Sequence, residues 1–341
     1  GGTGGGNTNN CPNAEPCANE LEELNEFCQC ELAINPITPV NPEINFAKEI
    51  NTCLGSNFTI NELNTLNANS TVDQLYNYVF DDFGNCNPEN PEFAEVVAEI
   101  MLEDEDIEFS ELELIIPQMD KECQANIILN ALFVNSTFTN TFKEALIKNP
   151  DKHINFQDLA VGEGDPDSPM TSDVGARVHL DLSVEGDAVI MEFNNNHLDQ
   201  ATNLGYINTL YHEMVHAYII HLYHENTLLT IYPEYTDLNI AITNALANPL
   251  DVTLGEIYKK EAHDIYIDFI DLLAESLLQY AIKNNIDGVD LDYARKLVWG
   301  GLYNYDVFTD NLTPAQQLEA QTLVGYENFN YEEAKGPKTC N

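Results

Sequence analysis

The sequence predicts an α+β fold in two unequal parts, and three observations support this. The first is the distribution of the 8 cysteines, because six of them fall in the first 90 residues. The second is a strand–turn–strand pattern over Ala176–Leu182 and Ala188–Phe193, with Gly186-Asp187 between them. The third is the segment that directly follows, where apolar residues recur with helical period from Leu204 to Leu222.

These observations divide the chain into three segments. Residues 1–10 are rich in glycine and are expected to form a flexible linker. Residues 11–118 are expected to form a small, mostly helical, cysteine-rich and acidic module. Residues 119–341 are expected to form the larger domain, with a small sheet followed by two long helices. A chain of 341 residues is long enough for two such domains.

The charge of the chain excludes several classes of partner. There are 13 Lys and Arg against 57 Asp and Glu, which gives a formal net charge of −44. Such a surface repels phosphate backbones, so nucleic acid is excluded as a partner, and anionic membrane surfaces are disfavoured. No apolar run approaches the roughly 18 residues that a membrane span requires.

The cysteines indicate an oxidising compartment. Six are expected to staple the N-terminal module: Cys11, Cys17, Cys28, Cys30, Cys53 and Cys86. The remaining two, Cys123 and Cys340, are expected to form a bridge that closes the second domain. Disulfides persist outside the cytoplasm, which predicts a secreted or cell-surface protein. The alternative is a cytosolic enzyme with reduced cysteines.

Several short helices are expected on either side of the domain boundary. In the N-terminal module, amphipathic patterns cover Leu21–Cys30, Val72–Phe83 and Pro91–Leu102. In the larger domain, Gln124–Phe133 and Asn140–Lys148 have helical patterns. An acidic loop rich in Gly, Pro, Ser and Asp follows over Glu163–Asp173.

The segment His212-Glu213-Met214-Val215-His216 is the most informative motif in the chain. Its two histidines are four positions apart on a predicted helix, so both imidazoles project from one face and can bind one metal ion. Glu213 lies beside them, where its carboxylate can reach a water molecule without binding the metal. Two neutral His ligands, an open coordination position and a carboxylate base are typical of a zinc peptidase site.

A third protein ligand is expected from the next long helix, predicted over Lys259–Lys283. His263 is the first candidate, because it shares the buried face of that helix. Glu261 and Asp264 are the alternatives, and Asp264 could instead accept a hydrogen bond from an imidazole N–H. His221 and His224 point away from the two motif histidines and are expected to be surface or core-edge residues.

The segments Thr209–Ala217 and Glu261–Asp264 resemble zincin metallopeptidases of the SprT-like kind. They are more similar still to a group of secreted bacterial metallopeptidase-like proteins, which also carry segments like Trp299–Leu302 and Lys338–Cys340. Asp264 stands where that group commonly has Glu. The resemblance covers about residues 120–341. It implies a zincin-like domain with His212, His216 and His263 as Zn²⁺ ligands and Glu213 as the base. Ile219 and Leu222 replace the Gly and His of the metzincin pattern, so that branch is excluded.

In zincin folds the edge strand of a small sheet holds the extended substrate, and Ala188–Asn194 is the candidate for that strand. The predicted function is therefore zinc-dependent hydrolysis of peptide bonds in a protein or peptide substrate. Tyr266, Tyr303 and Tyr305 are candidate donors to the oxyanion. Two alternatives remain: a secreted effector or toxin peptidase with one protein target, and a non-catalytic zinc-stabilised binding or adhesion module. The oligomeric state is not predicted.

Overall fold

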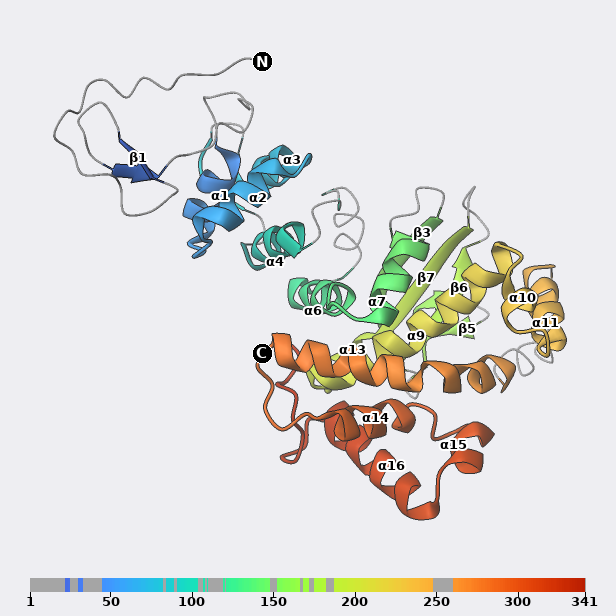
Figure 1. Cartoon of the computed structure of the whole chain (residues 1–341). Helices are drawn as coiled ribbons and strands as arrows, with labels where there is room; N and C mark the ends of the chain where they lie inside the picture. Colours follow the sequence, from blue (N-terminus) through green and yellow to red (C-terminus); the bar gives the residue numbers. More distant parts are fainter. Residues whose placement is uncertain are drawn as a thin grey trace, which may run out of the picture. The chain divides into compact units, whose positions relative to one another are not determined.

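The protein is described here from a computed structural model. It describes residues 22–24, 30–32, 45–81, 84–88, 91–103, 107, 109, 119, 121–147, 152–165, 168–171, 175–181, 187–247 and 260–340. The chain divides into two units, residues 1–45 and 46–341. It is a mixed α/β protein, mostly helical, with a three-stranded sheet in the larger unit (Figure 1). The boundary predicted between residues 118 and 119 lies next to undescribed residues and stays a prediction.

The smaller unit contains two short antiparallel strands, β1 (Glu22–Leu24) and β2 (Cys30–Leu32). The helix expected over Leu21–Cys30 is therefore wrong at both ends of that segment. Glu22–Leu24 and Cys30–Leu32 pair with each other, so the backbone groups of these residues take their hydrogen bonds from a strand partner and not from a helix. The predicted linker and the positions of Cys11, Cys17 and Cys28 lie outside the described residues.

The larger unit begins with four helices that pack on one another: α1 (Phe46–Leu54), α2 (Ile60–Ala68), α3 (Val72–Val79) and α4 (Pro91–Glu103). Thr59 and Glu62 form a capping box at the start of α2. Helix α3 ends earlier than the predicted Phe83, because Phe80 leaves the helix and pairs with Cys86 in a β-bridge. A disulfide between Cys53 and Cys86 links this segment to α1. The sequence predicts disulfides among the first six cysteines but leaves their pairing open.

The three-stranded sheet has the order β3 (Lys152–Leu159), β7 (Asp187–Asn194), β6 (Ala176–Asp181). The predicted strand–turn–strand is confirmed, since β6 and β7 pair antiparallel. The predicted edge position of Ala188–Asn194 is wrong. Strand β3 pairs parallel to β7 over its full length, which makes β7 the central strand with both of its edges used. The strand signal in β3 is the alternation of Ile154 and Phe156 with polar residues.

Short elements and helices surround the sheet. Between α4 and β3 lie α6 (Glu122–Leu132), α7 (Thr137–Phe142) and a π-helical turn over Lys143–Ile147. The predicted helix over Asn140–Lys148 thus starts earlier and changes its winding. The predicted acidic loop contains two antiparallel strands of two residues each, β4 (Gly164–Asp165) and β5 (Ser168–Pro169). Helix α8 (Asn195–Leu198) then leads from β7 into the long central helix.

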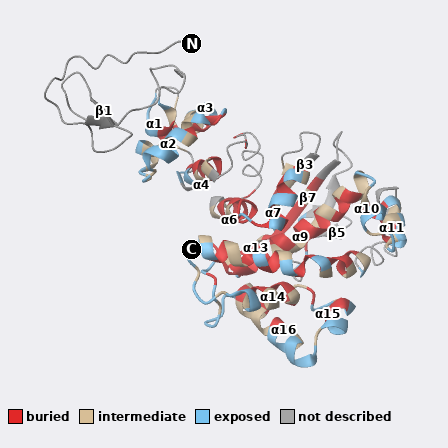
Figure 2. Ribbon diagram, in the orientation of Figure 1, coloured by how far each residue is buried: buried red, intermediate tan, exposed pale blue. Residues whose placement is uncertain are grey.

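The central helix α9 (Asn203–His224) contains the motif, and it is buried on nearly all sides. It contacts β6 and β7 on the sheet. Among the helices it contacts α6, α13 (Ile270–Lys283), α14 (Leu291–Gly300) and α16 (Pro314–Asn328). Tyr206 and Tyr211 on this helix are among the largest fully buried side chains. Figure 2 shows the buried residues concentrated along α9 and α13. A helix that is apolar on most of its faces belongs in the interior, which explains why α9 is so placed.

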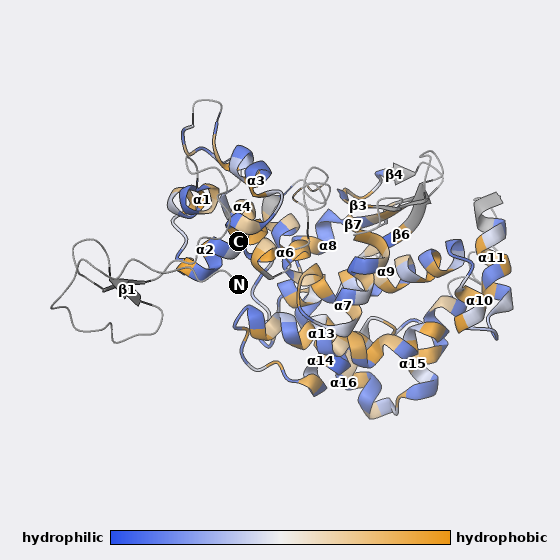
Figure 3. Ribbon diagram, turned by 45° about the horizontal axis from the view of Figure 1, so that its top comes forward, coloured by the Kyte–Doolittle hydropathy of each residue, from blue (hydrophilic) through white to orange (hydrophobic). Residues whose placement is uncertain are grey.

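After α9 come α10 (Leu228–Ile231) and α11 (Thr236–Ala247). The predicted Lys259–Lys283 helix is interrupted: residues 260–266 are helical, Ile267–Phe269 form a 3₁₀ turn, and α13 covers Ile270–Lys283. Its acidic stripe is solvated, as predicted, with Asp268, Asp271 and Glu275 exposed. Figure 3 shows apolar residues recurring between polar ones along these helices, as amphipathic packing requires.

The chain ends with α14 (Leu291–Gly300), α15 (Asp306–Asn311) and α16 (Pro314–Asn328), followed by a tail. Helices α14 and α16 pack closely: a Cβ built on Gly300 would lie 2.8 Å from the Ala320 carbonyl oxygen. The tail returns to α6 through a disulfide between Cys123 and Cys340, which confirms the predicted pair. None of the helices in the described residues is long and apolar enough to cross a membrane.

Candidate metal centre

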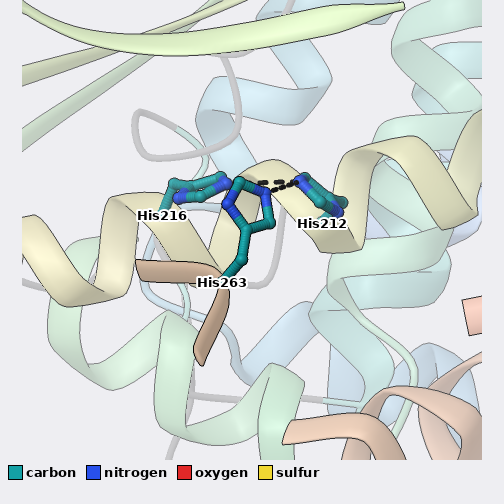
Figure 4. A group of neighbouring side chains, drawn as sticks. All are labelled: His212, His216 and His263. Atoms are coloured by element: carbon teal, nitrogen blue, oxygen red, sulfur yellow. Dashed lines mark hydrogen bonds between the residues drawn. The ribbon is translucent and has the colours of Figure 1, made fainter. Parts of the chain in front are cut away.

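Three histidines from two helical segments converge beside the sheet. His212 and His216 project from one face of α9, and His263 comes from the helical residues 260–266 (Figure 4). Their ligand atoms all lie within 4.8 Å of one another. His216 and His263 are buried, and His212 is half-buried. The structure thus brings together the three histidines that the sequence singles out, and this group could hold a metal ion.

The ring nitrogens have the spacing of a metal site. The Nε2 atom of His212 lies 3.2 Å from Nε2 of His216 and 3.2 Å from Nε2 of His263. Nitrogens bound to one tetrahedral zinc ion at its usual bond length are about 3.3 Å apart. A ring nitrogen has one in-plane direction for its proton or lone pair, so His212 Nε2 makes at most one well-directed hydrogen bond. A cation between the rings would instead meet all three lone pairs.

Burial keeps the imidazoles of His212 and His216 neutral, which is the form that binds metal. Removal from water, and then the proximity of His263, lower the pKa of His212 to about 3. The pKa of His216 is lowered well below its ordinary value, by burial first and then by the other two histidines. A proton therefore does not compete with a metal ion for the nitrogens of these two histidines at neutral pH.

Glu213 directly follows His212 on α9 and does not belong to the histidine group. Its side chain is 7% exposed, and its carboxylate is not among the grouped ligand atoms. Burial raises the pKa of Glu213 to about 8. A carboxyl group held near neutral pKa can both accept and release a proton under ordinary conditions.

Two tyrosines lie against the histidines. The Tyr266 ring is 4.9 Å from the His212 ring, centroid to centroid, and Tyr266 is 1% exposed. The Tyr305 ring stacks on His263 at 3.5 Å with an angle of 16° between the rings. Tyr303, the third tyrosine suggested by the sequence, is 50% exposed and has no described ring contact with these histidines. Position along the chain does not distinguish Tyr303 from Tyr305, because the distinction depends on how the turn before α15 folds.

The alternative third ligands lie elsewhere. Asp264 is engaged by Lys260 Nζ at 2.9 Å on the outer face of its helix. Glu261 accepts a backbone hydrogen bond from Leu238 of α11. Neither belongs to the grouped ligand atoms, and neither do His221 and His224. Of the residues weighed as third ligand, His263 is the one that meets the motif histidines.

Fold and site together define a mixed α/β protein whose buried central helix and following helical segment present three histidines able to hold a metal ion. Comparison with protein-family models, with curated proteins and with solved structures gives no match.

Proposed function

We propose that this chain is a zinc-dependent metallopeptidase with a zincin-like catalytic domain. The single observation that carries the proposal is the convergence of His263 on the two histidines of the His212–His216 motif. The motif also contains Glu213, which directly follows His212 and is buried. A binding module needs the three histidines but has no use for a buried carboxylate next to them. A hydrolase that activates a water molecule needs both the three histidines and the carboxylate.

Zinc is the metal that suits this set of ligands. Three neutral imidazoles with nitrogens 3.2 Å apart across two of their pairs fit a tetrahedral site that leaves a fourth position for water or substrate. When bound, zinc would supply a Lewis acid that polarises the scissile carbonyl and lowers the pKa of a water molecule. His212, His216 and His263 would hold it.

Glu213 would move the proton in the reaction. As the water oxygen bonds to the carbonyl carbon, one water proton passes to the Glu213 carboxylate, and the carbonyl π electrons move onto the carbonyl oxygen. Glu213 then gives that proton to the amide nitrogen while the C–N bond breaks, which leaves a carboxylic acid and an amine. The buried position of Glu213 supports this role, since a carboxylate of raised pKa is a better base than an exposed one.

The sheet offers an edge for an extended substrate. Strand β7 is central, so it has no free edge for the predicted substrate. Strand β6 is the candidate instead, because it pairs with β7 alone in the described sheet and contacts α9. A peptide added to this edge would gain main-chain hydrogen bonds close to the helix of the motif. The disulfides Cys53–Cys86 and Cys123–Cys340 support an extracytoplasmic location for this activity.

The test is the substitution Glu213→Gln in zinc-loaded protein, with casein as substrate. We expect the variant to keep about one zinc per chain and to lose hydrolysis by about 100-fold or more. Hydrolysis at the wild-type rate would remove Glu213 from the mechanism. Zinc binding without hydrolysis of casein by the wild type would favour a single-target effector peptidase or the binding module. Those two differ in whether any host or competitor protein is cut.

A further inference from the structure

A third chain segment closes the histidine group. The turn between α14 and α15 lies against both ligand-bearing segments: a Cβ built on Gly301 would lie 3.5 Å from His212 Nδ1, and the Tyr305 ring stacks on His263. The turn is held by its own backbone, since Tyr305 N–H donates to the Leu302 carbonyl at 2.9 Å and Leu302 is fully buried. Tyr305 is therefore fixed relative to the histidines by two independent contacts.

Exposure separates Tyr305 from the other two tyrosines. Tyr266 packs in the core and is 1% exposed. Tyr303 is on the surface. Tyr305 is half-buried: one face of its ring covers His263, and part of the side chain reaches solvent. Of the three, only Tyr305 combines contact with the metal-binding histidines and access for a ligand.

Tyr305 lies within electrostatic range of Glu213. Burial, and after it the charge of Glu213, raise the pKa of Tyr305. The stacked geometry keeps the phenol ring nearly parallel to the His263 imidazole, with 3.5 Å between the ring centroids. Tyrosine is protonated at neutral pH in any case, so the hydroxyl is available there as a hydrogen-bond donor.

We propose that the Tyr305 hydroxyl donates a hydrogen bond to the carbonyl oxygen of the substrate as negative charge develops on it. This inference rests on the proposed peptidase function and adds a catalytic residue from outside the His212–His216 motif. The proton of Tyr305 stays on its own oxygen throughout. The carbonyl π electrons that move onto the substrate oxygen are stabilised by this donor until the C–N bond breaks and the carbonyl re-forms.

The decisive variant is Tyr305→Phe, which keeps the ring and its stacking on His263 and removes only the hydroxyl. The matched control is Tyr303→Phe, two residues away on the same turn and exposed. We expect Tyr305→Phe to bind zinc like the wild type and to lose about 10²–10³-fold in kcat, with KM nearly unchanged. Tyr303→Phe is expected to match the wild type in all three measurements.

A second readout does not depend on turnover. Acetohydroxamate binds zinc through two oxygens, one of which occupies the position of the developing oxyanion, so its affinity for the zinc-loaded protein probes the donor directly. We expect about tenfold weaker binding to Tyr305→Phe, as calorimetry would measure it, and unchanged binding to Tyr303→Phe.

The outcomes separate this inference from the proposed function. Wild-type kcat and wild-type acetohydroxamate affinity in Tyr305→Phe would overturn the role of Tyr305 and leave the peptidase in place. Loss of zinc in Tyr305→Ala, with Tyr305→Phe fully active, would likewise overturn it and make the ring a stacking support. A wild-type protein that binds no zinc would overturn the peptidase and this inference together.

Discussion

Thr202 and Glu327 join the last helix of the chain to the start of the central helix. The Thr202 hydroxyl donates to the Glu327 carboxylate, and the Thr202 backbone N–H donates to the Glu327 carbonyl oxygen at 2.7 Å. The same hydroxyl accepts from Gly205 N–H at 3.2 Å and so caps α9. A negative charge at this position also suits the positive end of the helix dipole. The helix of the motif is therefore held in place through a residue that is 125 positions away in the sequence.

Glu327 is fully buried, and its carboxylate accepts from four groups: the hydroxyls of Thr202 and Tyr293 and the backbone N–H groups of Lys335 and Gly336. The substitution Glu327→Ala leaves these donors without an acceptor. Hydrogen bonds to a charged group contribute about 1.5–3 kcal/mol each, so we expect the free energy of unfolding to fall by about 3 kcal/mol or more. Urea unfolding followed by circular dichroism measures this.

The control for Glu327 is Glu319→Ala on the same helix. Glu319 is 57% exposed and pairs with Lys296 on the surface. Such a pair contributes little, so the free energy of unfolding is expected to change by less than about 1 kcal/mol. If Glu327→Ala is no more destabilised than Glu319→Ala, the buried carboxylate does not hold the helix.

The two described disulfides close chain segments of very different length. Cys123 and Cys340 are 217 positions apart, and Cys53 and Cys86 are 33 apart. The entropy that a cross-link removes from the unfolded chain grows with the length of the loop, and gives about 5 kcal/mol for the long loop and about 4 kcal/mol for the short one. We expect the double substitution Cys123→Ser with Cys340→Ser to lower the urea midpoint further than Cys53→Ser with Cys86→Ser. The reverse order would mean that local contacts, rather than chain entropy, decide the effect.

The candidate metal site was largely predictable because its signals are local. The spacing of His212 and His216 places both rings on one helix face, and the pattern around His263 places that ring on a buried face. Both faces are expected in the interior of the same domain, where they can meet. The convergence of the three histidines therefore follows from short-range patterns, and it is what the structure has.

The parts that sequence patterns did not reveal depend on contacts between distant segments. The central position of β7 follows from its pairing with β3, more than 30 residues earlier in the chain. The sequence pattern within β7 does not indicate which strand will be its partner. The stacking of Tyr305 on His263 and the burial of Glu327 depend in the same way on how the last helices return to α9. Glu327 looks like any surface glutamate in the sequence of an acidic protein.

The role of His263 as a ligand is tested by His263→Ala. Loss of one of three imidazoles is expected to weaken zinc binding by more than about 100-fold, because even loss of a residue that only orients a ligand costs 10–100-fold. Competition with a chromogenic chelator measures the affinity. The matched control is His221→Ala, on α9 but outside the histidine group, which is expected to bind zinc like the wild type. Unchanged affinity in His263→Ala would exclude this residue and return Glu261 and Asp264 to consideration.

The stability of the metal-free protein is expected to depend on pH through Glu213. The folded-state pKa of about 8 lies above the ordinary value of 4.5, so between these values the folded protein keeps a proton that the unfolded chain releases. The contribution of Glu213 to stability is then complete below pH 4.5, falls as the pH rises towards 8, and is lost above it. In Glu213→Gln this dependence is absent, because an amide does not titrate in this range.

The measurement is urea unfolding of both proteins in the presence of a chelator from pH 5 to pH 8.5. The two histidines with lowered pKa values, His212 and His216, are present in both variants, so the difference between the unfolding curves isolates Glu213. We expect the wild type to lose stability relative to Glu213→Gln as the pH rises through this window. A difference that stays constant with pH would mean that Glu213 has the same pKa in the folded and unfolded protein. Its carboxyl group would then be solvated and would not have the raised pKa expected of the base. Zinc should reduce the difference, because a cation next to the carboxylate favours its charged form.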